Sequence, residues 1–531
     1  MTATIAVAPS AAAHVDGRAV PRDGTRVVLL PVNRLCLLVI CAVEVVLAWR
    51  PGPNVSAFED EGLYVYMGHR MLDHLLNGAF LQEFPGSYFS GAPGIYPPIA
   101  AIADSLGGLQ AARSISVVSV MVTTVAVHGM TRRLFGRAAA VLAALVFALA
   151  PGVIFQSHLA TYDAMMMMLV AIGAWFAVYS AQDNELLWAP GVGLLLAFAA
   201  LTKYAGAVYI PFVAAIATIV AWPSLRWTAL RRAVFIGASA LGVAFFVIQI
   251  WGRDLVAGIL QTTLQRDIIQ HLPREQLIAQ VVRWTGPIVG LALLGGLLRM
   301  RRQWILCGVL LAAAVVGPAQ QIRLGEATSL GKHTAFGMVF AAPLAGDLLA
   351  RILRARREIL VWPVIAAIAC LAVVGVRQAN TMATGWVDER PLTPVLTALA
   401  QAQPGQPILG EQPSPQRYAL RKLIGPHQWA DTYSFRFNGK TGTAAYADAV
   451  RLHYFGTVYL SSRTDNGAYL MQLMTSPRRD RYYNIKAKVP RYLRGRKVGE
   501  WLVFAPRSVV LQPGAKASAS AAGPPAETGG T

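Results

Sequence analysis

The sequence predicts a polytopic α-helical membrane protein with a small α/β domain outside the bilayer. Of its 531 residues, 55% are hydrophobic and only 14% are charged, which is too apolar a balance for a soluble protein. Many apolar runs approach the roughly 20 residues that a membrane-spanning helix needs. After residue 377 the composition becomes that of a soluble domain, and this change predicts the second part of the fold.

The apolar runs predict about eleven membrane spans. Some runs are shorter than a full span, but a helix that packs against neighbours or crosses a thin bilayer can be short. We expect the spans near residues 35–49, 109–130, 138–156, 164–180, 186–201, 205–222, 233–251, 285–298, 305–319, 334–349 and 359–376.

Arginine-rich loops alternate with less basic ones, which is the pattern expected when the basic loops are cytoplasmic. The basic loops are residues 132–137, 226–232, 299–302 and 351–357. We therefore expect a multi-pass protein of the cytoplasmic membrane whose N-terminus is cytoplasmic. An odd number of spans then places everything after residue 376 on the extracytoplasmic side.

These boundaries divide the chain into four predicted parts. They are a cytoplasmic tail at 1–34, a transmembrane domain at 35–376 with a first outer loop at 50–108, an α/β domain at 377–512, and a disordered tail at 513–531. The last part is low-complexity sequence of Ala, Gly, Ser and Pro, which cannot bury enough apolar surface to fold.

The extracytoplasmic domain alternates helix-like with strand-like stretches, as α/β domains do. Helices are expected at 392–402 and 444–453, and strands at 457–461 and 500–504. From residue 378 onward there are 19 Lys and Arg against 9 Asp and Glu. That charge suits anionic headgroups, phosphate or an acidic polymer, although ordinary basic composition explains it equally well.

Three carboxylates, Glu59, Asp60 and Glu61, directly follow the first predicted span. At a bilayer surface such groups can hold a cation or accept a proton from a hydroxyl. The alternative is a solvated acidic loop that only helps to set the topology. Glu44 lies inside the first span and is expected to be a buried, hydrogen-bonded structural carboxyl. The four cysteines lie in apolar runs and predict neither disulfides nor a metal site.

The order of motifs downstream resembles the dolichyl-phosphate-mannose protein mannosyltransferase superfamily. The bacterial relatives that it resembles are the lipid-A aminoarabinose transferase and other transferases that use polyprenyl-phosphate sugars. The resemblance covers residues 35–376. The motifs in order are Asp60-Glu61, Pro97-Pro98, Arg113-Ser114, Arg132-Arg133-Leu134-Phe135-Gly136, Ala150-Pro151, Asp163, Leu201-Thr202-Lys203-Tyr204 and Lys332-His333.

This resemblance implies a GT-C fold whose active site opens to the outer face. It implies a hexosyl- or pentosyltransferase with a polyprenyl-phosphate-linked sugar as donor and a protein, lipid or glycan as acceptor. Membrane lipids are further expected partners, and no nucleic acid is expected. By resemblance, Asp60 is the catalytic carboxylate and Glu61 its partner. The implied donor phosphate-binding residues are Lys203, Arg113, Lys332, His333 and Arg323, and Asp163 and Tyr96 support them.

The chemistry fits these residue types. A sugar phosphodiester already has a good leaving group, so the harder task is to deprotonate or orient a hydroxyl while positive charge builds at the anomeric carbon. One carboxylate, Asp60, can do this in a single displacement with inversion. Two assignments have structural alternatives: Lys203 can form an ion pair with Asp163, and Arg113 can pair with Asp60 or simply snorkel.

No cofactor is certain from the sequence. A divalent metal is compatible with the family, and Glu83 and His271 are loose candidate ligands. The competing function is a transporter or flippase of lipid-linked sugars, which would favour an internal repeat and ionisable groups at the membrane midplane. The sequence shows no such repeat. A third reading is a non-catalytic subunit of polysaccharide assembly, against which the presence of Asp60 argues.

Overall fold

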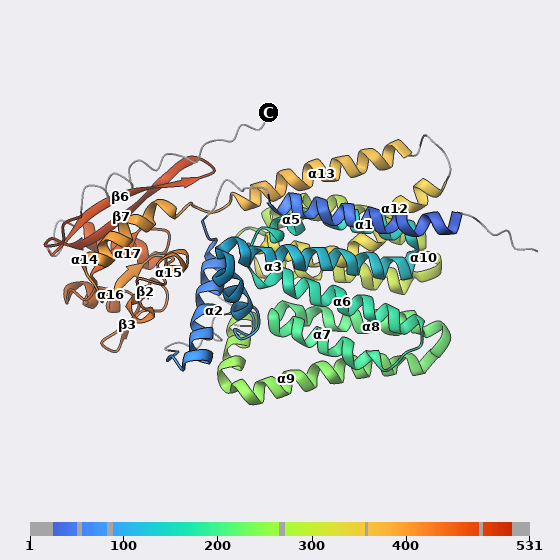
Figure 1. Cartoon of the computed structure of the whole chain (residues 1–531), viewed down its shortest axis with the longest axis horizontal. Helices are drawn as coiled ribbons and strands as arrows, with labels where there is room; N and C mark the ends of the chain where they lie inside the picture. The colour runs from blue at the N-terminus through green and yellow to red at the C-terminus, as the bar shows by residue number, and fades with distance from the viewer. Residues whose placement is uncertain are drawn as a thin grey trace, which may run out of the picture.

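The computed structural model describes residues 25–49, 56–81, 89–264, 271–355, 359, 361–476 and 482–511. The tail predicted at 513–531, most of the tail predicted at 1–34, and the candidate metal ligand Glu83 lie outside the described residues. The remainder forms a bundle of apolar helices and a C-terminal α/β domain beside one end of that bundle (Figure 1). The predicted fold class is therefore confirmed.

The long bundle helices lie side by side along one direction, and each predicted apolar run lies on one or two helices (Figure 1). The bundle helices are α1 (Thr25–Trp49), α3 (Tyr96–Phe135), α4 (Arg137–Ala148), α5 (Pro151–Ser157), α6 (Tyr162–Gln182), α7 (Trp188–Thr202), α8 (Ile210–Leu225), α9 (Leu230–Ile259), α10 (Arg274–Leu324), α11 (Leu330–Phe336), α12 (Met338–Arg354) and α13 (Val361–Ala383). Short turns join them at η2 (Tyr204–Tyr209), η3 (Arg226–Ala229) and η4 (Leu260–Leu264).

Several helices are broken. Among the described residues, five stretches are long and apolar enough to cross a membrane, and seven are if each bent pair counts as one span. The bent pairs are α4 with α5, at 65°, and α11 with α12, at 54°. The 51-residue α10 has a non-helical residue at Gln303, and one of the five stretches contains both α8 and α9. Eleven crossings therefore stay a prediction.

Small residues allow the bundle helices to approach closely. A Cβ on Gly346 of α12 would lie 2.5 Å from the amide nitrogen of Ala143 on α4, and one on Gly337 would lie 1.9 Å from the carbonyl of Ala314 on α10. Apolar side chains such as Leu38 and Trp362 point outward, as they do in a protein whose solvent is lipid.

Two of the arginine-rich loops meet at one buried carboxylate. Asp347 of α12 accepts hydrogen bonds from Arg299 and Arg351, and it thereby joins the loop predicted at 299–302 to the loop predicted at 351–357.

Helix α2 (Glu59–Asn77) runs across the end of the bundle (Figure 1). It begins with a capping box in which the Glu61 carboxylate accepts the amide of Phe58 at 2.8 Å. A kink at Gly107 and Gly108 divides α3, and the part before this kink is called its first arm. Helix α2 crosses the first arm so closely that a Cβ on Gly68 would lie 2.0 Å from the carbonyl oxygen of Pro97. The predicted first outer loop thus contains a helix and the first arm of α3, which ends at the kink at Gly107 and Gly108.

The C-terminal domain is an α/β unit with a five-stranded sheet in the order β2-β1-β5-β7-β6. Strands β1, β2 and β5 are parallel, and β7 pairs antiparallel with β5 and β6. Its elements are η6 (Arg390–Leu392), α14 (Thr393–Ala402), β1 (Ile408–Gly410), α15 (Ser414–Ala419), η7 (Pro426–Gln428), β2 (Trp429–Asp431), β3 (Arg436–Phe437), β4 (Lys440–Thr441), α16 (Gly442–Arg451), β5 (Thr457–Leu460), α17 (Asp465–Thr475), β6 (Tyr483–Leu493) and β7 (Arg496–Pro506). The two predicted helices and two predicted strands are all present.

The domain meets the bundle through α15, which follows strand β1. A Cβ on Gly62 of α2 would lie 2.7 Å from the carbonyl oxygen of Ser414, so the two helices touch through their backbones. Glu411, between β1 and α15, is fully buried and accepts the amides of Ser461 and Thr464. It thereby fixes the ends of β1 and β5 relative to each other beside α2.

Candidate functional site

Four of the predicted site residues form a continuous row of alternating charge. The Lys332 ammonium lies 2.5 Å from the Asp60 carboxylate and 3.5 Å from that of Asp163. The other oxygen of Asp163 accepts a hydrogen bond of 2.6 Å from Lys203. The row contains two cations and two anions, so its formal charge is zero.

Only one end of this row meets solvent. The Asp60 side chain is 28% exposed, whereas Lys332 is 3%, Asp163 0% and Lys203 4% exposed. Buried charges are tolerated when each has an opposite partner within contact distance. Asp60 and Asp163 both lie in the first turn of a helix, α2 and α6 respectively, where the helix dipole favours a negative charge. The carboxylate of Asp60 is therefore partly open to solvent while its ion pair with Lys332 fixes its position.

Hydrogen bonds to the main chain fix the segments that contain Lys332 and Lys203. Helix α5, which starts after the break at Ala150-Pro151, packs on α11, and the Gln156 side chain donates a 2.5 Å hydrogen bond to the carbonyl of Lys332. Residues 90–92 of the first outer loop pair with the Lys203 segment, since Ala92 donates to the carbonyl of Leu201 at 2.6 Å and Tyr204 to that of Ser90 at 2.8 Å. Motifs far apart in the sequence therefore build one site.

Aromatic rings surround the buried lysines. Lys203 lies 4.9 Å from the ring centroid of Tyr162 and 5.7 Å from that of Phe336, and Lys332 lies 5.7 Å from that of Phe58. The predicted supporting residue Tyr96 makes an edge contact with Tyr162 at 6.4 Å. Ring faces stabilise cations that have left water. Tyr162 and the two phenylalanines have no distinguishing pattern in the sequence, because aromatic residues at span ends are common.

Glu61 and Arg113 form a separate pair. The Arg113 guanidinium donates two hydrogen bonds of 2.8 Å to the Glu61 carboxylate, which is fully buried and also accepts the amides of Phe58 and Ala160. Arg113 thus pairs with Glu61, and neither alternative in the sequence analysis, a pair with Asp60 or a snorkelling side chain, describes it. The geometry favours a structural role for both residues over the roles implied by the resemblance.

The remaining candidates make no ion pair with the row within the described residues, although the His333 ring packs on Phe336 beside Lys203. The His333 ring is hydrogen-bonded to the Gln321 side chain, and Arg323 is exposed and donates to Gln320 at 3.1 Å. Glu44 is buried and accepts from Thr124, as expected. Within the described ranges, no group of three or more His, Cys, Asp or Glu residues could hold a metal ion.

A second set of carboxyls joins α2 to the C-terminal domain. Burial, together with the negative charge of Asp60, raises the pKa of Glu59 to about 7. Burial, together with the charge of Glu59, raises the pKa of Glu389 to about 8, against the hydrogen bond from Gln416 and the charges of nearby arginines. The contact between the two parts therefore favours protonated carboxyls.

These shifts predict that stability falls as the pH rises. Because both pKa values lie above the ordinary value of 4.5, the folded chain holds these protons more tightly than the unfolded chain. The resulting stabilisation is fully present below pH 4.5 and is lost as the pH rises toward 8. We expect Glu389→Gln to raise the apparent melting temperature at pH 8 by about 2–5 °C and to flatten its pH dependence. Glu500→Gln, at an exposed carboxyl of the same domain, is the control, and equal pH profiles for wild type and Glu389→Gln would contradict the assignment.

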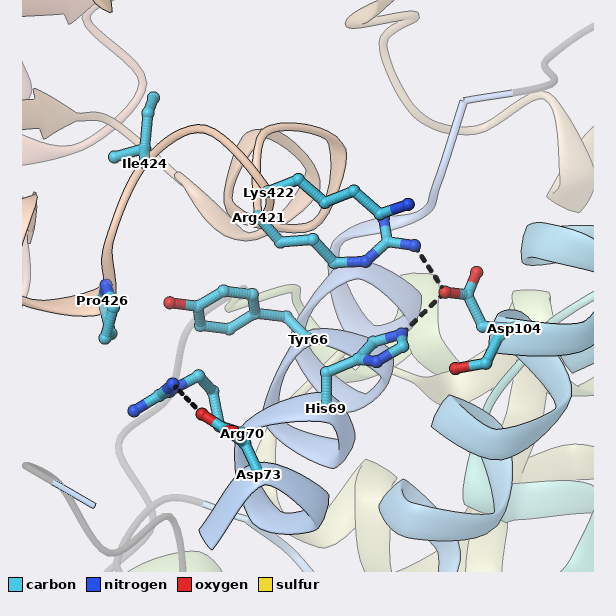
Figure 2. Close-up of a pocket in the computed structure, with 10 residues that line it drawn as sticks. Tyr66, His69, Arg70, Asp73, Asp104, Arg421, Lys422, Ile424 and Pro426 are labelled. Atoms are coloured by element: carbon cyan, nitrogen blue, oxygen red, sulfur yellow. Dashed lines mark hydrogen bonds and ion pairs between the residues drawn. The ribbon is translucent and has the colours of Figure 1, made fainter. Parts of the chain in front are cut away.

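Asp104 links three elements near the same contact. Its carboxylate lies 2.7 Å from His69 of α2 and 2.7 Å from Arg421 (Figure 2). It also accepts a 2.5 Å hydrogen bond from Tyr418. Tyr418 and Arg421 belong to the C-terminal domain, so Asp104 helps to fix that domain on α2. No local pattern predicts this cluster, because Asp104 is more than 300 residues from Tyr418 and Arg421.

A protein-family model and several solved structures resemble this chain. Residues 98–251 match the family model described as dolichyl-phosphate-mannose-protein mannosyltransferase. None of the curated proteins matches the sequence significantly. Among solved structures, ArnT from Cupriavidus metallidurans bound to undecaprenyl phosphate is similar with a TM-score of 0.56 and 16% identity, over 92% of this chain and 100% of that one.

Two structures from Archaeoglobus fulgidus are also similar. The oligosaccharyltransferase in its apo form has a TM-score of 0.55 and 13% identity, and AglB with an inhibitory peptide and dolichol-phosphate has 0.54 and 14%. Both alignments cover 81% of this chain and 69% of the other. At such identities the likeness establishes a common fold. The chain is therefore a protein of the GT-C fold, and its residues 98–251 relate it to the dolichyl-phosphate-mannose-protein mannosyltransferases.

Proposed function

We propose that this protein is a membrane glycosyltransferase that moves a sugar, with inversion, from a polyprenyl-phosphate donor to a hydroxyl of a lipid, glycan or protein acceptor. The observation that carries the proposal is the row of charges that ends in the exposed carboxylate of Asp60. The family match and the GT-C fold support the donor class, because ArnT and AglB are described with undecaprenyl phosphate and dolichol-phosphate.

In this proposal Asp60 is the general base. It takes the proton from the acceptor hydroxyl while that oxygen attacks the anomeric carbon, and the polyprenyl phosphate leaves from the opposite face of the sugar. Lys332 orients the Asp60 carboxylate through their ion pair, and its positive charge also acts at longer range on the phosphate as negative charge grows there. The exposed guanidinium of Arg323 has free donors for the same phosphate. Glu61 and Arg113 fix the start of α2 and so position Asp60.

We further propose the orientation that the arginine-rich loops indicate, in the cytoplasmic membrane and with the C-terminal domain outside. The loop at 299–302 and the residues near 351 lie together through Asp347. A reporter that is active only outside the cytoplasm should then be active when fused after Val376 and silent within 351–357. The reverse pattern would place Asp60 in the cytoplasm and remove the proposed reaction.

Vesicles that contain the purified protein, supplied with lipid, glycan and protein fractions of the cell envelope as acceptors, test the function directly. We expect one member of a panel of labelled polyprenyl-phosphate hexoses and pentoses to be consumed, with release of polyprenyl phosphate and formation of a product of inverted configuration. Arg323→Ala should raise the donor KM by about 10- to 100-fold, since a hydrogen bond to a charged group is lost. Vesicles in which no donor is consumed, or in which intact donor only changes leaflet, would contradict the proposal.

The contact between Lys203 and Asp163 leads to a separate prediction. Because Lys203 is nearly inaccessible and paired, we expect it to support Lys332 rather than to touch the phosphate. Lys203→Met and Asp163→Asn should each lower stability by about 3–5 kcal/mol, because each leaves an uncompensated buried charge. The double variant should recover much of that loss. A stable Lys203→Met protein with a raised donor KM would instead favour direct phosphate binding.

A further inference from the structure

A cleft of about 440 Å³ lies between α2, the first arm of α3 and the C-terminal domain, and none of the four residues in the row of charges lines it. Figure 2 shows the Tyr66 ring in the middle of this cleft, with Arg421 and Lys422 on one side and Arg70 and Asp73 on the other. We propose that the cleft is a subsite for a saccharide unit that carries an anionic group.

The lining suits a saccharide. It places an aromatic ring among groups that donate and groups that accept hydrogen bonds, and a sugar presents both kinds of group around its ring. A smaller hollow shares Tyr66 and Arg70 with the cleft and is also lined by Trp429. Trp429 is 8% exposed, and its indole N–H has no hydrogen-bond partner in the part of the chain that the structure describes. The indole N–H is itself buried, and Trp429 lines the smaller hollow and not the cleft.

The charge of the lining favours an anion. Asp104 is already neutralised by Arg421 and is also held by His69 and Tyr418, and Asp73 pairs with Arg70 at 3.1 Å. Lys422 is exposed and makes no ion pair with any residue in the described ranges. One positive charge is therefore left for the ligand, and such a charge selects between anionic and neutral partners.

The position of the cleft assigns it to the acceptor, which rests on the proposed function. Asp60 and His69 lie on the same helix, and nine residues separate them by about 14 Å along its axis and by about two and a half turns around it. The two side chains therefore lie on opposite sides of α2, and an acceptor oligosaccharide that reaches both would have to pass around this helix. The acceptor's anionic unit would lie in the cleft while its terminal hydroxyl meets Asp60.

Two simple probes test the subsite without the donor. Methyl β-glucuronide and methyl β-glucoside differ only in a carboxylate, and their binding to the full chain in lipid nanodiscs can be measured by saturation-transfer NMR. We expect the glucuronide to bind at least fivefold more tightly. Lys422→Glu should abolish this preference and Lys422→Arg should keep it. Lys488→Glu, which changes an exposed lysine of β6 outside the cleft, is the matched control.

Equal binding of the two probes, or a preference that survives in Lys422→Glu, would overturn the proposal. A preference that Lys488→Glu removes as well would also overturn it, because the effect would then come from the charge of the whole domain. Binding as expected in a protein that consumes no polyprenyl-phosphate sugar would establish the saccharide subsite while the proposed function failed, so the two proposals fail separately.

Discussion

Replacing Asp60 with asparagine is expected to lower the turnover number of sugar transfer by about 10²- to 10⁴-fold, the usual contribution of a positioned general base. Asparagine has nearly the same shape and can still accept a hydrogen bond from Lys332, so the fold and donor binding should change little. The measurement is single-turnover transfer from a saturating labelled donor, together with the thermal stability of the variant.

Glu59 provides the control for this experiment. It precedes Asp60 on α2 but interacts with charged groups of the C-terminal domain. Glu59→Gln should therefore leave the turnover number within about tenfold of the wild-type value, well short of the loss of a general base. If Asp60→Asn transferred sugar at a rate close to that of wild type, the assignment of the base would have to be abandoned.

Arg113→Met should lower the stability of the protein by about 3–5 kcal/mol. The Glu61 carboxylate is fully buried, and without the guanidinium its charge would have no partner in a site that excludes water. Because Glu61 also caps α2 and accepts the amide of Ala160, the start of α2 should loosen. Unfolding in detergent, followed by fluorescence, measures the change.

A double-mutant cycle separates this structural role from phosphate binding. Glu61→Gln removes the charge but keeps an oxygen for the backbone amides, so Glu61→Gln combined with Arg113→Met should be more stable than Arg113→Met alone. The folded fraction should keep the wild-type donor KM. Wild-type stability of Arg113→Met together with a raised donor KM would show that Arg113 touches the phosphate after all.

The sequence was sufficient to predict the fold class because its signals are local. Apolar runs mark helices, and the arginine-rich loops alternate along the chain whatever the tertiary structure. The secondary structure around residues 393–402 and 457–460 follows in the same way from local periodicity. The breaks at Ala150-Pro151 and Gln303 carry weaker signals, since proline and packing can bend a helix without ending it.

The site was predicted less completely, because its contacts connect distant residues. Asp60 and Lys332 were both expected at the site, but their direct contact spans 272 positions and depends on how α11 is held. Adjacent carboxylates likewise look equivalent in a sequence. The structure separates them, since successive residues of a helix point in different directions: Glu61 turns inward to Arg113 and Asp60 outward to Lys332.

The neutral row of charges has a consequence for how the reaction distributes charge. When Asp60 accepts the proton of the acceptor, the protein side of the site changes from zero to one positive charge. In the same step the donor phosphodiester becomes a phosphate monoester and gains one negative charge. The two changes are equal and opposite, so the net charge of the row and the donor together stays at one negative charge throughout the transfer. The separated products, by contrast, attract each other, and release of the lipid phosphate is therefore expected to be helped by return of that proton to water.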